Sequence, residues 1–186
     1  MSGSPKELVL NREEVLRLLA RLGNRLAAKG IHAEVFIVGG AAMALAYDAD
    51  RTTSDIDAIL RPRDLVYNEA NSMAEELGIP DDWLNDSVRS LMPSNPDDAP
   101  KAIAEFPGIT ITTGSPEFML AMKSMVTRKS VADLQDAAKI CVMLGIYDEY
   151  YLERTIRKYI GTGALGSQEL WLEDIVELAR KLAPDS

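Results

Sequence analysis

The spacing of apolar residues along the chain predicts both helices and short strands. Alternating or short apolar runs predict strands at 33–38, 55–60, 102–106 and 109–113. Apolar residues at helical spacing predict helices at 11–28, 64–77, about 82–90, 115–125, from 130 onward, 148–160 and 168–182. Because strands and helices do not alternate regularly, the pattern favours an α+β fold with a small mixed sheet flanked by helices and a helical C-terminal portion.

Capping and stop signals fix several of these boundaries. Asn11 precedes the first helix with Glu14 three residues on, which is a variant of the capping box. Ser115 is followed by Pro116 at the first helical position, and Ser130 is followed by Asp133 at the third. Each of these three helices is therefore expected to begin at a polar side chain that accepts a hydrogen bond from the backbone.

Length and composition limit the number of domains. A chain of 186 residues with 47% hydrophobic residues forms one domain, or one domain with a small helical appendage. We expect a core over residues 1–146 and a helical extension over 147–186 packed on it. The glycine-rich segment 161–166 is expected to join the last two helices.

The segment from Val35 to Leu60 carries the strongest chemical signal. An apolar strand ends in Gly39-Gly40, a short helix of small residues follows, and the next strand carries Asp55 and Asp57. Residues at i and i+2 of a strand project from one face, so these two carboxylates are expected to lie together. Such a pair suits a divalent cation such as Mg²⁺ or Mn²⁺, and a helix N-terminus beside it suits phosphate. The segment therefore predicts nucleotide chemistry, whereas a second triplet, Asp48-Ala49-Asp50, reads as solvated loop.

Charge and rare residues exclude several function classes. The net charge of −9 is atypical of a general nucleic-acid binder. A single cysteine, Cys141, excludes an internal disulfide and fits a reducing cytoplasm, and its apolar helical context predicts a buried, inert thiol. The single histidine, His32, excludes histidine-rich zinc sites and disfavours hydrolases with a catalytic histidine. No apolar stretch has the roughly 20 residues needed to span a bilayer, so no membrane association is expected.

These motifs together resemble the nucleotidyltransferase superfamily with the polymerase-beta-type fold. Its pattern of strand, Gly-Gly or Gly-Ser, short helix and D-x-D is similar to Gly39-Gly40 and Asp55-Ile56-Asp57. The chain most resembles the AbiEii-type toxin nucleotidyltransferases and a related bacterial family of uncharacterised role. The resemblance covers roughly residues 30–145 and rests also on three further runs: 51–54 before the carboxylates, 82–86 (Asp-Trp-Leu-Asn-Asp), and 115–136, which includes Lys123 and Arg128.

The resemblance implies a role for each matching residue. Asp55 and Asp57 would bind the metal ions, and Gly39 and Gly40 would hold the triphosphate. The remaining implied site residues are Lys123 at phosphate, Arg51 and Ser54 at the nucleotide, and a third carboxylate from Asp136 or Asp133. We favour Asp136, because Asp133 already has a role in capping its helix. The short helix lacks the basic residue that many members carry after the glycine pair, so Arg51 or Lys123 would have to meet the triphosphate charge.

The function that the resemblance implies is transfer of a nucleoside monophosphate from a nucleoside triphosphate to an acceptor hydroxyl. The acceptor would be RNA, most simply tRNA, in a toxin–antitoxin or defence system, with an antitoxin protein as partner. The alternatives are a protein or small-molecule acceptor, or a non-catalytic protein that binds nucleotides or partners. Arg154, Arg157 and Lys158 are expected to share one face of a helix. This face has two possible interpretations, a solvated surface or a contact with RNA.

Overall fold

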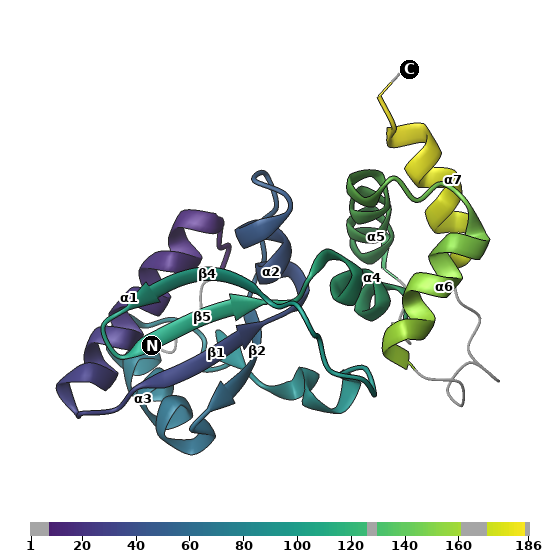
Figure 1. The fold of residues 1–186 in the computed structure, drawn as a ribbon. Helices are drawn as coiled ribbons and strands as arrows, with labels where there is room; N and C mark the ends of the chain where they lie inside the picture. The colour runs from purple at the N-terminus through teal and green to yellow at the C-terminus, as the bar shows by residue number, and fades with distance from the viewer. Residues whose placement is uncertain (1–7, 126–129, 161–170, 185–186) are drawn as a thin grey trace. The chain divides into compact units, whose positions relative to one another are not determined.

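The computed structural model describes residues 8–125, 130–160 and 171–184 as a mixed α+β structure (Figure 1). Its helices are α1 (Arg12–Ala28), α2 (Gly39–Ala46), α3 (Arg63–Leu77), α4 (Pro116–Ser124), α5 (Val131–Leu144), α6 (Glu149–Ile160) and α7 (Leu172–Leu182). Its strands are β1 (Ala33–Ile37), β2 (Ile56–Arg61), β3 (Leu84–Asn85), β4 (Lys101–Phe106) and β5 (Ile109–Thr113), with a 3₁₀ helix at Ser87–Leu91. The expected α+β class with a small mixed sheet is confirmed. No helix among the described residues is both long and apolar enough to cross a membrane.

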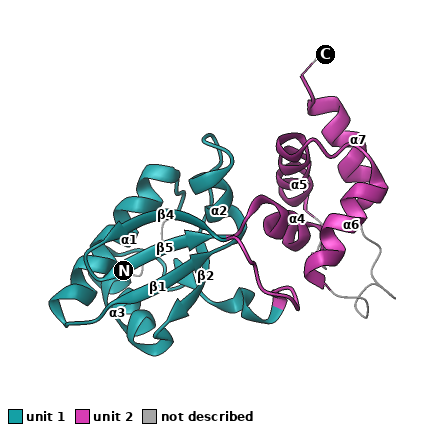
Figure 2. Ribbon diagram, viewed as in Figure 1, with its two compact units in different colours: residues 1–90, 100–113 teal, residues 91–99, 114–186 magenta. Residues whose placement is uncertain are grey.

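The chain divides into two compact units (Figure 2). The first unit comprises residues 1–90 and 100–113, and the second comprises residues 91–99 and 114–186. This division differs from the expected boundary after residue 146. Helices α4 and α5 pack against α6 and α7, so they belong to one helical unit with the C-terminal pair.

The first unit contains a five-stranded sheet with the strand order β3-β2-β1-β5-β4. Strand β1 pairs antiparallel with β2 and parallel with β5, and the β4–β5 hairpin is antiparallel. The two-residue strand β3 adds parallel to β2. The strands expected at 102–106 and 109–113 are therefore confirmed and form a hairpin through Pro107-Gly108. In the region 82–90, where the sequence predicts a short helix, the first part forms β3 and the second part belongs to the 3₁₀ helix.

One face of the sheet forms the core of the first unit. Alternate residues of the three central strands are buried, as expected from their period of two: Ala33, Val35, Ile37, Ile56, Ala58, Leu60, Ile109 and Ile111. Helix α1 packs on β4 and β5, α3 packs on β2 and β3, and the two helices contact each other. Trp83 is fully buried in this unit and donates its indole Nε1–H to the Ala70 carbonyl at 3.2 Å, as a core anchor does.

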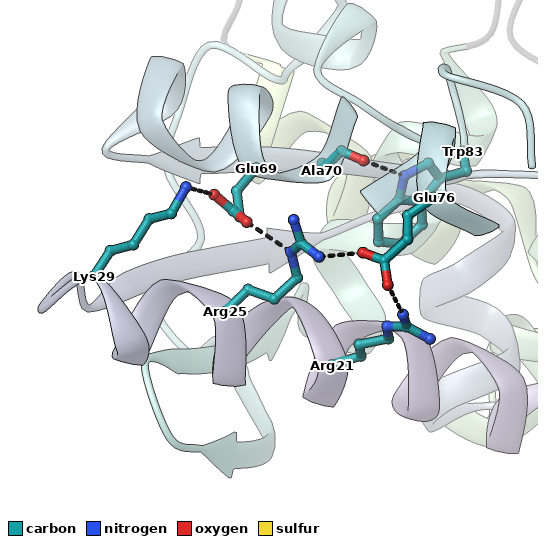
Figure 3. A network of polar contacts seen from close by, with 7 residues as sticks. All are labelled: Arg21, Arg25, Lys29, Glu69, Ala70, Glu76 and Trp83. Atoms are coloured by element: carbon teal, nitrogen blue, oxygen red, sulfur yellow. Dashed lines mark hydrogen bonds and ion pairs between the residues drawn. The ribbon is translucent and has the colours of Figure 1, made fainter. Parts of the chain in front are cut away.

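A network of charged side chains joins α1 to α3 (Figure 3). Glu69 on α3 is only 4% exposed and accepts hydrogen bonds from Arg25, at 2.6 Å, and from Lys29. Glu76 lies two turns after Glu69 on α3, and it pairs with Arg21 at 2.6 Å and with Arg25. The bonds from Lys29 and Arg25 lower the pKa of Glu69, against the opposing effect of its burial.

The second unit is a set of four helices tied to the segment 91–99. Phe118 of α4 and Tyr159 of α6 pack edge to face with ring centroids 5.3 Å apart. Asp97 accepts hydrogen bonds from the backbone N–H of Ser115, at 2.6 Å, and from its hydroxyl, at 2.9 Å. Asn95 donates to two carbonyls at the end of α6, so this segment caps both α4 and α6.

The three expected helix caps are present. Asn11 and Glu14 form the full capping box of α1. Ser115 accepts from the Phe118 N–H at the start of α4, and Ser130 accepts from the Asp133 N–H at the start of α5. The expected linker 161–166 lies outside the described residues.

Candidate functional site

The glycine pair marks an abrupt turn from β1 into α2. Strand β1 ends at Ile37, Val38 is extended, and Gly39 has a φ of +67° and begins the helix. That backbone conformation is strained for residues with a side chain, which explains glycine here. Helix α2 has neither a side-chain cap nor an acidic residue in its first turn. Its first backbone N–H groups, which have no partner within the helix, are the donors that an anion would use.

Both glycines lie directly against the loop and strand that carry the predicted acidic residues. A Cβ on Gly39 would lie 2.9 Å from Oδ2 of Asp57, and a Cβ on Gly40 would lie 2.8 Å from Oγ1 of Thr53. The Val38 N–H donates to the Asp57 carbonyl at 2.9 Å, which ties the turn to β2. The structure therefore brings Gly39 close to Asp57, although the two are 18 residues apart in sequence.

Asp55 lies immediately before β2, which begins at Ile56. Its carboxylate is half-buried and accepts a hydrogen bond from Nδ2 of Asn85 at 3.3 Å. Burial raises the pKa of Asp55, while the bonds from Asn85, Thr53 and Ser54 act in the opposite direction. On β2 itself, Asp57 is half-buried between two buried neighbours, so it projects from the face opposite the core.

Arg51 and Ser54 lie on the loop between α2 and β2. The guanidinium of Arg51 donates to the Thr52 carbonyl, and its Nη2 lies 3.5 Å from the position a Cβ on Gly40 would take. Arg51 thus places a cation beside the glycine turn. Ser54 is exposed, and its side chain helps to lower the pKa of the neighbouring Asp55 against the effect of burial. The predicted roles of Arg51 and Ser54 at the nucleotide stay predictions.

Lys123, Asp133 and Asp136 form a separate cluster inside the second unit. The Lys123 Nζ lies 2.8 Å from a carboxylate oxygen of Asp133 and 2.8 Å from one of Asp136. Lys123 is 6% exposed and Asp136 is 1% exposed, so their charges are mutually compensated within the protein. Asp133 also accepts from the Ser130 hydroxyl at 2.6 Å, so both aspartates, and not Asp133 alone, have a structural partner. The predicted roles of Lys123 at phosphate and of Asp136 or Asp133 as third carboxylate stay predictions.

The cysteine, the histidine and two of the basic residues of α6 noted in the sequence each have neighbours that account for them structurally. Cys141 is fully buried, and burial raises the pKa of its thiol to about 12, which excludes a thiolate nucleophile at neutral pH. His32 lies at the surface with Nε2 2.9 Å from the Thr110 hydroxyl. Arg157 pairs with Glu153 at 2.9 Å, and Lys158 pairs with Asp98 at 3.2 Å. Arg128, part of the resemblance, lies outside the described residues.

Asn85 and Thr53 are the site residues that sequence reasoning did not assign. Asn85 pairs in register with Asp57 across the β2–β3 ladder and bonds to Asp55, so one side chain borders both predicted metal ligands. Thr53 supports the same loop by donating to the Asp55 carbonyl at 3.1 Å. The signal for Asn85 was present in the run Trp83-Leu84-Asn85, in which two apolar residues precede a polar one at the end of a short strand.

Comparisons of the chain with protein-family models, with curated proteins and with solved structures find no match. Within the described ranges, no group of three or more histidine, cysteine, aspartate or glutamate residues is arranged to hold a metal ion. The first unit offers two carboxylates that both border Asn85, a glycine turn at a helix N-terminus and the guanidinium of Arg51 beside it. This arrangement could bind a metal–phosphate complex in which the phosphate completes the coordination.

Proposed function

We propose that the chain is a metal-dependent nucleotidyltransferase with a nucleotidyltransferase-type fold in its first unit. The observation that carries this proposal is the contact of the glycine turn with Asp57, in which a Cβ on Gly39 would lie 2.9 Å from the carboxylate. That contact supports the proposal because it brings a helix N-terminus, a kind of site that suits phosphate, beside a carboxylate that could bind a metal ion.

The donor set of this region fits Mg²⁺ or Mn²⁺ better than a softer metal. Asp55 and Asp57 supply oxygen ligands, and the described residues include no cluster of three ligating side chains. Mg²⁺ commonly binds through one or two carboxylates together with substrate phosphates and water. When bound, such a cation would neutralise charge on the triphosphate and stabilise the oxygens of an in-line displacement.

The chain's own residues would bind and orient the nucleotide. The N–H groups at Gly39 and Gly40 would donate to phosphate oxygens, and Arg51 would supply the positive charge that the short helix lacks. The acceptor hydroxyl oxygen would attack the α-phosphorus, the bond from that phosphorus to the bridging oxygen would break, and pyrophosphate would leave. The hydroxyl proton would pass to solvent. Catalysis of this kind rests mainly on positioning and charge.

The acceptor and the biological setting are a further part of the proposal. An RNA 3′ end, such as that of tRNA, in a toxin–antitoxin or defence system is the setting that the resemblance implies, with an antitoxin protein as partner. Lys123 and Asp136, to which the resemblance gives roles, belong to the second unit and form an ion pair with each other there, so the proposed mechanism assigns them no step.

A transfer assay with several acceptors tests this function. The protein is incubated with Mg²⁺ and each α-labelled nucleoside triphosphate, together with total tRNA, with protein extract or with small hydroxylated molecules. We expect label on one class of acceptor and none with the Asp55→Ala/Asp57→Ala variant. Equal labelling by the variant would contradict the assigned residues. Metal-dependent nucleotide binding without transfer to any acceptor would indicate the non-catalytic alternative.

A further inference from the structure

A second concave site lies within the helical unit, beside the end of α5 and the outer face of α6. Its volume is about 660 Å³, which is in the range of small-molecule sites. Leu144 and Ile146 supply apolar surface, and Tyr151, Arg154 and Lys158 of α6 supply a ring and two cations. None of these residues takes part in the proposed transfer reaction.

Arg154 differs from the neighbouring basic residues in having no counter-ion among the residues that the structure describes. Arg157 pairs with Glu153, and Lys158 pairs with Asp98 while its Nζ lies 5.1 Å from the centroid of the Tyr159 ring. In the part of the chain that the structure describes, no hydrogen bond or ion pair involves the Arg154 guanidinium. A guanidinium presents forked donors that match a phosphate or a carboxylate, so Arg154 is available for an anionic group.

An exposed aromatic ring lies on the same helix, one turn before Arg154. Tyr151 is 59% exposed and its ring packs edge to face with Tyr150, the centroids being 5.5 Å apart. That contact with Tyr150 restricts the ring while most of its surface remains open. With Leu144 and Ile146 nearby, Tyr151 offers apolar area on which a planar group can pack.

Glu117 also lines this site and limits the charge of what could bind. Its carboxylate would repel a second anionic group, because like charges in one small site are unfavourable. We propose that the site binds a small molecule that carries one anionic group on a planar ring system, a description that a nucleoside monophosphate meets. A nucleic-acid strand fits less well, since Arg157 and Lys158 of α6 are already paired with acidic side chains and, among the described residues, Arg154 alone of the three is not.

Calorimetric titration of the whole chain tests this site. The titration uses the Asp57→Asn variant with a metal chelator, because both changes remove nucleotide binding at the proposed transfer site. A failure to detect AMP binding under these conditions would therefore overturn the second site and leave the proposed function unaffected. We expect AMP and phenyl phosphate to bind more tightly than adenosine, inorganic phosphate or ATP. In this background, Arg154→Gln and Tyr151→Ala should each weaken AMP binding about tenfold. The first removes a charge-assisted hydrogen bond and the second removes a stacked ring.

The matched control is Arg157→Gln, which makes the same change of charge on the same helix at a residue that does not line the site. It should leave AMP binding unchanged, and thermal unfolding followed by circular dichroism should show that both arginine variants fold. Equal weakening by the two arginine variants would overturn the proposal, because it would indicate a general charge effect. Absence of binding by both AMP and phenyl phosphate, or binding only of an oligonucleotide, would overturn it too.

Discussion

Replacing Gly39 by alanine perturbs the glycine turn at the point where it contacts Asp57. The φ of +67° is unfavourable for alanine, and the added methyl group would lie 2.9 Å from the Asp57 carboxylate oxygen. Ordinary van der Waals contact begins at 3.4 Å. The carboxylate or the turn must therefore move by about half an ångström, in addition to the backbone strain.

The expected magnitude follows from these two effects. The left-handed backbone conformation costs alanine about 1–2 kcal/mol relative to glycine. Displacement of packed atoms adds to this, so we expect a loss of about 2–4 kcal/mol in the free energy of unfolding. Misplacement of a reacting group by about 1 Å can lower a rate about a hundredfold, so transfer should fall roughly ten- to hundredfold.

Urea denaturation followed by circular dichroism gives the stability, and label transfer gives the activity. Gly30→Ala is the matched control, because Gly30 has a φ of +70° and nothing lies within 4 Å of an added Cβ. Gly30→Ala should lose only the part of the free energy of unfolding that comes from the left-handed backbone conformation, and it should keep its activity. If Gly39→Ala is no less stable than Gly30→Ala and transfers label at the wild-type rate, the contact with Asp57 does not matter for function.

Three further predictions concern the stability of the chain and its thiol. Glu69→Gln should lower the free energy of unfolding at neutral pH by about 1–3 kcal/mol, because Arg25 and Lys29 lose a charged acceptor. Because these bonds lower the pKa of Glu69, its contribution is present above the ordinary carboxyl pKa and is lost as the pH falls below that value. Urea titrations from pH 7 to pH 3, roughly the carboxyl range, should thus show a steeper loss for wild type than for the variant. At pH 8, about the pKa of a free thiol, Cys141 should not react with a thiol reagent until the protein is unfolded, because burial raises the pKa of its thiol to about 12. Rapid labelling of the folded chain would contradict this. Trp83→Phe should destabilise by about 2 kcal/mol, because it removes the bond to Ala70 and leaves a cavity where the fully buried indole packs. An unchanged urea midpoint would contradict the role of Trp83 as a core anchor.

Local sequence signals predicted most of the first unit. The alternation in 55–60 placed Ile56, Ala58 and Leu60 on the buried face, and the structure buries all three. The cap residues Asn11 and Ser115 act over only three positions, which is why they could be assigned without knowledge of the fold. The closeness of Gly39 to Asp57 followed from a strand, a turn and a returning strand within one short segment.

Long-range pairings could not be predicted from the sequence. Residues 82–90 read as a short helix, but Leu84–Asn85 pairs with β2, which no local pattern reveals. Glu69 looks like a surface residue of an amphipathic helix, and its burial depends on two cations from α1. In the same way, the paired charges of Lys123 with two aspartates depend on how α4 packs on α5.

Transfer from an α-labelled nucleoside triphosphate by the Asp57→Asn variant would show whether Asp57 takes part in catalysis. Asp50→Asn is the matched control, since it makes the same chemical change in the exposed second triplet of the chain. We expect Asp57→Asn to lose at least about a hundredfold in Mg²⁺-dependent transfer, as for loss of a main electrostatic contact, and Asp50→Asn to retain wild-type activity. Equal transfer by Asp57→Asn and wild type would contradict a role of Asp57 in metal-dependent transfer.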